Sequence, residues 1–140
     1  MHDCVIVDTG PIVAYLNRAE QPHDWVVGQF KRLRPPLLTC EPVLVEAMFL
    51  LEDDTGDATP VLDLLERGVL QIALSVEDEV PAVRQLMRRF RNVPMSLADA
   101  CLVRLSETRE KPVVFTLDSD FSIYRRHGRL VIPTLMPPGQ

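Results

Sequence analysis

Four acidic residues of this sequence stand inside or directly after apolar runs, which is an unusual place for a carboxylate. A buried, ionised carboxylate is costly unless it is paired or bound to a metal. The other acids mostly gather in polar turns and at helix starts, where water solvates them. The four residues are Asp8, after the apolar run 5–7, Glu46, within 43–51, Asp99, within 97–103, and Asp118, after 113–117.

Such acids could share one chemical task if the fold brought them together. Several carboxylates within a few ångströms repel one another, and divalent cations relieve that repulsion. Oxygen ligands without cysteine or clustered histidine favour Mg²⁺ or Mn²⁺. The chemistry that uses such a site is phosphoryl chemistry, in which one metal lowers the pKa of an attacking water and a second stabilises the leaving oxygen.

Each acid also has a local explanation. Asp8 could start a turn and helix before Pro11, and Glu46 could pair with a buried arginine or become neutral. Asp99 could be the capping-box partner of Ser96, and Asp118 could form a plain Asx turn. No single motif distinguishes a metal ligand from its local explanation. The local explanation needs four unrelated reasons, whereas a metal cluster needs one.

The elements that must position these acids alternate between strands and helices. Continuous apolar strands indicate a parallel sheet covered on both faces, and ligands of such sheets bind beyond the carboxyl ends of the strands. Asp8 and Asp118 fall at such ends, and their strands can be neighbours if the chain order reverses between them. Strands are expected at 4–7, 37–39, 69–74, 113–116 and, as the last one, 130–132, and helices at 10–17, 24–33, 41–52, 59–67, 77–91 and 97–108.

The composition describes one ordinary folded domain over residues 1–140, with 46% hydrophobic and 25% charged residues. A net charge of −5 argues against coating nucleic acid by bulk charge. No apolar stretch reaches the roughly 18 residues of a membrane helix, and residues 1–3 lack the basic start of a secretory signal. We therefore expect a cytosolic protein. The cysteines are scattered and form no zinc motif, so we interpret them as buried apolar residues: Cys4, Cys40 and Cys101.

The order of the four acids resembles that of the PIN domain family, and especially of the VapC-type toxin ribonucleases. The resemblance covers essentially the whole chain. Its motifs are a strand ending in Asp before a Pro and an apolar helix, a Glu in an early apolar helix, a third acid in a Ser-Leu-Ala-Asp-Ala segment, and a Thr-x-Asp-x-x-Phe pattern. Here they stand at residues 5–16, 43–46, 95–100 and 116–121.

This resemblance implies a three-layer α/β/α sandwich with a parallel, roughly five-stranded sheet. It implies Mg²⁺- or Mn²⁺-dependent endonucleolytic cleavage of RNA, with the four acids holding the metals directly or through water. It places Thr116 beside these acids, where it could orient water or phosphate. Thr9 is a weaker candidate for a supporting role. Asp120 could supplement the cluster or cap the turn before Phe121. Family members are commonly homodimers, and the toxins are inhibited by an antitoxin protein encoded beside them.

Two alternatives belong to other functional classes. One is a PIN domain that no longer cuts and instead binds or regulates. The other is an aspartyl phosphatase, which wants a second Asp where Gly10 stands, so we discount it. PIN domains often have Ser where Gly10 stands. The difference removes a hydroxyl near the expected metal site and leaves the metal ligands unchanged.

Two further features could serve partners or substrate. The helix with Met48, Phe49 and Leu51 has more apolar surface than one core face needs, and could carry a dimer or antitoxin interface. Two basic clusters could hold RNA phosphates or complement helix dipoles. They are Arg84, Arg88, Arg89 and Arg91, and then Arg125, Arg126, His127 and Arg129.

Overall fold

The computed structural model describes residues 4–139 as alternating strands and helices. Residues 1–3, on which the expectation about a secretory signal rests, lie outside the described part. Among the described residues, no helix combines the length and apolar character that crossing a bilayer requires. The helices are α1 (Thr9–Leu16), α2 (His23–Arg32), α3 (Glu41–Thr55), α4 (Pro60–Glu66), α5 (Val80–Arg89) and α6 (Leu97–Glu107), with 3₁₀ turns η1 (Glu77–Glu79) and η2 (Ser119–Ser122).

Five parallel strands form the central sheet in the order β3-β2-β1-β4-β7. The predicted parallel α/β sandwich is therefore confirmed. β1 pairs with β2 on one side and β4 on the other, so the chain order reverses between β1 and β4. The strands are β1 (Cys4–Val7), β2 (Leu37–Thr39), β3 (Leu70–Ile72), β4 (Pro112–Phe115) and β7 (Thr134–Leu135).

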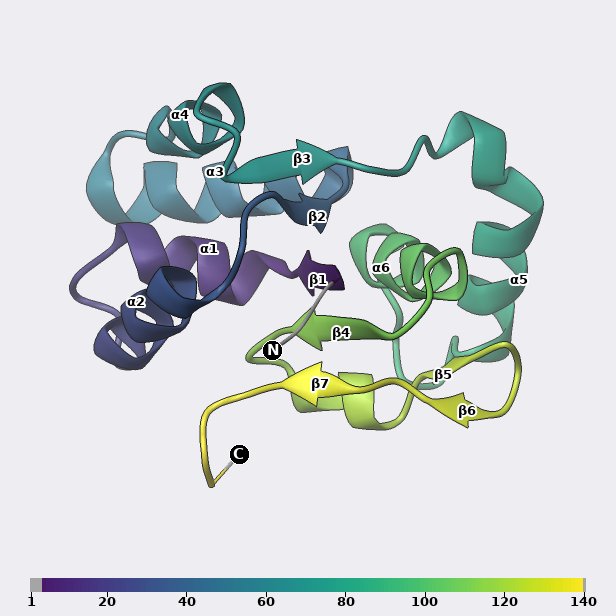
Figure 1. The fold of residues 1–140 in the computed structure, drawn as a ribbon. Coiled ribbons are helices and arrows are strands. Elements are labelled where there is room, and N and C mark those ends of the chain that lie inside the picture. Colours follow the sequence, from purple (N-terminus) through teal and green to yellow (C-terminus); the bar gives the residue numbers. More distant parts are fainter. Residues whose placement is uncertain (1–3, 140) are drawn as a thin grey trace.

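Helices cover both faces of this sheet. In Figure 1, α1 to α4 lie together on one side, and α5 and α6 lie on the other. The connections explain this division, because right-handed crossovers toward β3 and back toward β4 must pass over opposite faces. A reversal of this kind opens a crevice at the carboxyl ends of the two central strands. Asp8 and Asp118 follow those two strands.

Two aromatic contacts of Phe115 fix the central strand β4 to the helical layer. Phe115 is fully buried, and its ring lies 5.9 Å from that of Trp25 and 5.6 Å from that of Phe30, measured between centroids. Both partners come from α2. Phe115 directly precedes Thr116 and Asp118, so this packing holds the end of the strand that carries them.

The expected strand 130–132 was wrong as the last strand of the sheet. Leu130–Val131 forms β6, which pairs antiparallel with β5 (Arg125–Arg126) in a separate hairpin. The sheet instead ends with β7, whose register places Val114 beside Thr134 and Phe115 beside Leu135. Main-chain pairing with β4 makes this strand, and its side chains carry no apolar run to predict it.

The apolar run 43–51 suggests a helix that is buried all round Glu46, and this interpretation was also wrong. Val43, Leu44, Ala47 and Leu51 of α3 face the core, but Val45 is 68% exposed and Phe49 71% exposed. Glu46 lies on the exposed side as well. Of the three residues suggested for an interface, Phe49 is open to solvent, Met48 is half-buried and Leu51 belongs to the core.

Replacing Phe115 should destabilise the whole fold because α2 loses its contact with the central strand. We expect Phe115→Leu to lower the free energy of unfolding by about 1–3 kcal/mol in urea denaturation. Leu62→Ala is the matched control, since Leu62 on α4 is 46% exposed. It should change stability by less than about 0.5 kcal/mol. Equal effects of the two substitutions would show that this packing does not anchor β4.

Candidate metal centre

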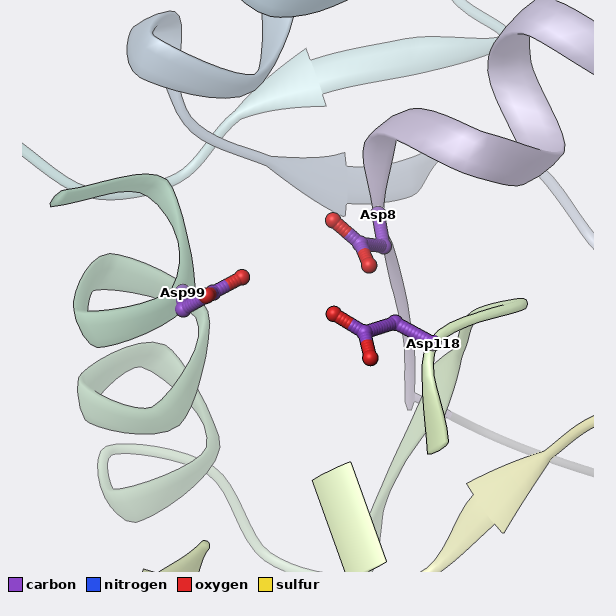
Figure 2. Close-up of side chains that lie close together, drawn as sticks. All are labelled: Asp8, Asp99 and Asp118. Carbon is purple, nitrogen blue, oxygen red and sulfur yellow. The ribbon is translucent and has the colours of Figure 1, made fainter. Parts of the chain in front are cut away.

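Three of the four predicted acids meet at the carboxyl ends of the central strands. Asp8, Asp99 and Asp118 each offer a carboxylate oxygen, and these oxygens all lie within 4.8 Å of one another. Figure 2 shows the three side chains pointing toward one another, Asp99 from α6 and the other two from the chain following β1 and β4. The spacing suits one shared cation, since oxygen ligands lie about 2.0–2.6 Å from Mg²⁺ or Ca²⁺.

Asp8 is placed by the pairing of β1 with β4. Its backbone N–H donates to the carbonyl of Phe115 over 3.0 Å, which extends the parallel ladder to the first residue after β1. Its side chain caps α1 by accepting a 2.8 Å hydrogen bond from the Thr9 N–H. The predicted helix start at Asp8 is thus present, and it coexists with the acid cluster.

Thr116 links Asp8 to the segment that carries Asp118. Its buried hydroxyl donates to Asp8 Oδ2 at 2.8 Å and accepts the Asp118 N–H at 2.9 Å. One side chain therefore sets the separation of two of the acids. The sequence-based expectation that Thr116 lies beside the cluster is confirmed.

Asp99 is held by both ends of a capping box at the start of α6. Its N–H donates to Ser96 Oγ, and its Oδ2 accepts the Ser96 N–H at 3.1 Å. The same Oδ2 accepts a 3.2 Å hydrogen bond from the hydroxyl of Tyr124, which is fully buried. Within residues 4–139, Asp99 Oδ1 has no hydrogen-bond donor and is open to a ligand.

Sequence reasoning missed Tyr124. A buried tyrosine hydroxyl needs a partner, but a Tyr next to Ile123 and Arg125 gives no sign that it is buried. Rings of Phe90 and Phe121 enclose it, with centroids 5.4 and 5.2 Å away. Burial raises the pKa of the Tyr124 phenol, and the Asp99 carboxylate raises it further, so Tyr124 remains a hydrogen-bond donor.

Asp118 caps the turn that follows β4. Its Oδ1 accepts the Asp120 N–H at 2.9 Å, which is the Asx turn considered above. No hydrogen bond in the described chain reaches Asp118 Oδ2, which leaves it free for a cation. Asp120 lies inside η2, outside the three-residue cluster, and the cap is Asp118. The suggestion that Asp120 caps the turn before Phe121 was therefore wrong.

Glu46 lies beside the cluster without joining it. Its Oε2 accepts a 3.0 Å hydrogen bond from Thr9 Oγ1, and Thr9 in turn donates its N–H to Asp8. Thr9 thus links the two acids, as its expected supporting role requires. The suggested ion pair of Glu46 with a buried arginine is absent among residues 4–139, where only Arg104 forms ion pairs with acids.

The cluster carries negative charge that no neighbouring cation neutralises within the described chain. Burial raises the pKa of Asp8 from 3.8 to about 6, although the hydrogen bonds from Thr116 and Thr9 favour its charged form. The Asp99 and Asp118 carboxylates raise it further. Burial also raises the pKa of Asp99. A divalent cation would relieve both effects, so the donor set fits a hard metal ion.

The cysteines take no part in this centre. Cys40 and Cys101 are buried as expected, and Cys4 is half-buried. All three are free thiols. Among residues 4–139, the group of acids around Asp8 is the one cluster with metal-ligand geometry, and it contains no cysteine or histidine.

Gly10 permits a close approach between the first turn of α1 and the segment that follows β4. A Cβ atom at this position would lie 3.2 Å from the side chain of Leu117, which separates Thr116 from Asp118. The absence of a side chain at residue 10 therefore lets Leu117 pack directly against the first turn of α1. This contact adds to the link that Thr116 makes between the same two segments.

Fold and acids together identify the class of protein. The sequence matches the PIN domain family over residues 5–126, and the chain belongs to that family. Its structure is similar to the crystal structure of VapC20 from Mycobacterium tuberculosis, described as a sarcin-ricin loop cleaving toxin. The TM-score is 0.77 at 21% sequence identity, over 85% of this chain and 93% of the other. No curated protein sequence matches the chain.

Removing the charge of Asp8 should stabilise the metal-free protein. The native state binds the Asp8 proton more tightly than the unfolded chain does, so wild-type stability falls as the pH rises from about 4 to about 6. In EDTA at pH 7, we expect Asp8→Asn to raise the free energy of unfolding by about 2 kcal/mol. Urea denaturation of both proteins at several pH values measures this difference.

The difference between the two proteins should shrink toward zero below about pH 3, where Asp8 is protonated in both the native and the unfolded state. Mn²⁺ should then raise the melting temperature of the wild type more than that of Asp8→Asn, because ligand binding to the native state stabilises it. If Asp8→Asn were less stable than the wild type at pH 7 in EDTA, the charge of Asp8 would not destabilise the metal-free protein as we expect.

Proposed function

We propose that this protein is a divalent-metal-dependent endoribonuclease of the VapC type, the toxin of a type II toxin–antitoxin pair. The observation that carries the proposal is the cluster of three aspartates, without a neutralising cation in residues 4–139, at the strand reversal of a PIN fold. Likeness to a toxin that cleaves RNA supports the substrate class. Residues 1–140 would act as one domain.

Asp8, Asp99 and Asp118 would hold Mg²⁺ or Mn²⁺ through their carboxylate oxygens, and Glu46 would act through a bound water. Bound there, the ion supplies positive charge at the phosphodiester and lowers the pKa of the attacking water. Asp99 Oδ1 and Asp118 Oδ2 are the oxygens left free by hydrogen bonds among the described residues. The hydrogen bonds to the other oxygen of each carboxylate fix its orientation, so the free oxygen points into the space between the three acids.

Three neighbouring residues would position the acids without touching the substrate. Thr116 holds Asp8 against the Asp118 backbone, Tyr124 holds Asp99, and Thr9 connects Asp8 to Glu46. Loss of a group that orients a metal ligand typically reduces activity 10- to 100-fold. Asp120 would contribute at most indirectly, through the backbone N–H that it donates to Asp118.

Cleavage should depend on both the metal and the cluster. We expect wild-type protein with Mn²⁺ to cut a pool of structured RNA, EDTA to stop it, and Asp8→Asn to reduce the rate at least about 100-fold. Thr116→Val should reduce the rate about 10- to 100-fold without removing the metal ligands. Product formation on denaturing gels measures all four reactions.

Asp57→Asn is the matched control, because Asp57 is a surface acid in a turn outside the cluster. It should cut RNA at the wild-type rate. The wild type could be folded, free of any bound inhibitor and stabilised by Mn²⁺, and still leave RNA intact. That result would favour the second candidate, a PIN domain that binds without cutting. Cleavage by Asp8→Asn at the wild-type rate would remove the proposal.

The toxin proposal includes protein partners, namely a second copy of this chain and a cognate antitoxin, in the cytosol. The apolar side of α3 supports an interface, since Val45 and Phe49 are 68% and 71% exposed and Leu50 is 41% exposed. Exposed apolar patches of this kind often mark protein–protein contacts. The patch borders Glu46, so a partner seated there would also shield the edge of the metal centre.

A charge placed in this patch should break the self-association. We expect the wild type to sediment as a dimer at micromolar concentration and Phe49→Glu as a monomer, because a carboxylate cannot be buried unpaired. Leu62→Glu, at an exposed position on α4, is the control and should remain dimeric. Wild type that sediments as a monomer would rule out a homodimer, and dimeric Phe49→Glu would place its interface elsewhere.

A further inference from the structure

Arginines are unevenly distributed over this acidic protein. The chain carries 15 basic and 20 acidic residues, yet residues 80–98 hold four arginines and no acid. This stretch covers α5 and the loop that leads into α6, the helix that bears Asp99. Positive charge is thus concentrated on one element beside the metal centre, and the phosphates of RNA would balance this charge.

The second basic cluster of the sequence is largely engaged within the protein. Arg125 donates to the carbonyls of Ser122, Ile123 and Tyr124. Arg126 donates to the carbonyls of Ser106 and Arg109 at the end of α6. These guanidinium groups satisfy main-chain acceptors and fasten the β5–β6 hairpin, so they are poorly placed to bind phosphate.

The arginines of α5 are different, because they surround an apolar groove. The groove has a volume of about 400 Å³ and a floor of aliphatic side chains, including Val80, Met87 and Leu97. Arg84, Arg88 and Arg91 line it, are exposed, and form no ion pair within residues 4–139. An apolar floor with cations around it matches an unpaired nucleotide, whose base is apolar on its faces and whose phosphates are anionic.

The first turn of α6 connects the groove to the acid cluster. Leu97 and Asp99 share the first turn of α6, and two residues along a helix project in nearly opposite directions. Leu97 lines the groove while Asp99 joins the acids, so this turn separates the two by roughly one helix diameter, about 10 Å. That distance is a short step along an RNA strand.

Resting on the proposed ribonuclease function, we propose that this groove, lined by Arg84, Arg88 and Arg91, binds an unpaired segment of the RNA substrate next to the bond that is cut. The arginines hold its phosphates, and the aliphatic floor contacts its bases and riboses. The net charge of −5 then does not oppose RNA binding, because the cations are gathered where the strand passes.

Binding measured without cleavage tests the groove separately from the metal centre. In EDTA, fluorescence anisotropy of a labelled RNA hairpin with an unpaired loop gives Kd at several salt concentrations. We expect the triple variant Arg84→Gln, Arg88→Gln, Arg91→Gln to bind at least about 10-fold more weakly. The slope of log Kd against log salt should fall by about 2, since each lost phosphate contact removes about 0.7.

A matched triple variant removes the same charge elsewhere. Arg18, Arg32 and Arg34 are exposed and lie between the end of α1 and the start of β2, in the layer of helices on the other side of the sheet from α5. Their replacement by Gln should change Kd by less than about 2-fold. Equal weakening by the two triple variants would show a diffuse charge effect and overturn the proposal.

The aliphatic floor has its own test. We expect Val80→Thr with Met87→Gln to weaken binding of the looped hairpin about 3- to 10-fold and to leave binding of a blunt RNA duplex unchanged, because a duplex keeps the faces of its bases stacked inside and offers the groove only its backbone. The salt slope should stay as in the wild type. Unchanged hairpin binding, or equal weakening for the duplex, would contradict a groove that takes unpaired RNA.

Three further outcomes separate the competing explanations. If the α5 variant loses cleavage through kcat with unchanged KM and unchanged Kd, the arginines do not bind substrate and the proposal fails. If RNA binding is unchanged but an acidic amphipathic helical peptide loses affinity, the groove belongs to a protein partner instead. Absence of cleavage by the wild type, with RNA binding still dependent on the arginines of α5, would reject the ribonuclease proposal and leave an RNA-binding groove.

Discussion

Three carboxylates with oxygens within 4.8 Å of one another repel, and the surrounding structure must hold them against that repulsion. The parallel pairing of β1 with β4 fixes Asp8 beside the end of β4, and the Thr116 hydroxyl ties it to the Asp118 backbone. α6 brings Asp99 from the opposite side, with its carboxylate clamped by Ser96 and Tyr124. The pKa of Asp8 is raised because burial disfavours its ionised form.

Each of these aspartates also stabilises the start of a helix or turn. Asp8 caps α1, Asp99 completes the capping box of α6, and Asp118 caps η2. The N–H groups and dipoles at helix starts favour negative charge, so three such starts converging on one point partly offset the repulsion. Capping and metal binding are therefore compatible uses of the same side chains, because in Asp99 and Asp118 one carboxylate oxygen accepts a main-chain N–H while the other faces the shared space.

The sequence predicts most of this arrangement and fails where exposure or main-chain pairing decides. Asp8 and Asp118 are recognisable because each ends a continuous apolar strand, and the strand order places them together. Glu46 was selected on the wrong ground, since an apolar run does not distinguish the core side of α3 from the side on which Val45 and Phe49 face solvent. Strand β7 and Tyr124 carry no local signal, because the strand depends on backbone pairing with β4 and the burial of Tyr124 depends on packing against the rings of Phe90 and Phe121.

The contact between Gly10 and Leu117 has a consequence for how this site can change over evolutionary time. A side chain at residue 10 would meet Leu117 at 3.2 Å, so even a serine there requires Leu117 to give way. Leu117 sits between Thr116 and Asp118, so a shift of its side chain by a few tenths of an ångström takes place directly beside the acid cluster. The two positions are thus expected to covary among homologues, with a small residue at one allowing a bulky residue at the other. A smaller side chain at residue 117 would make it easier to introduce a hydroxyl at residue 10.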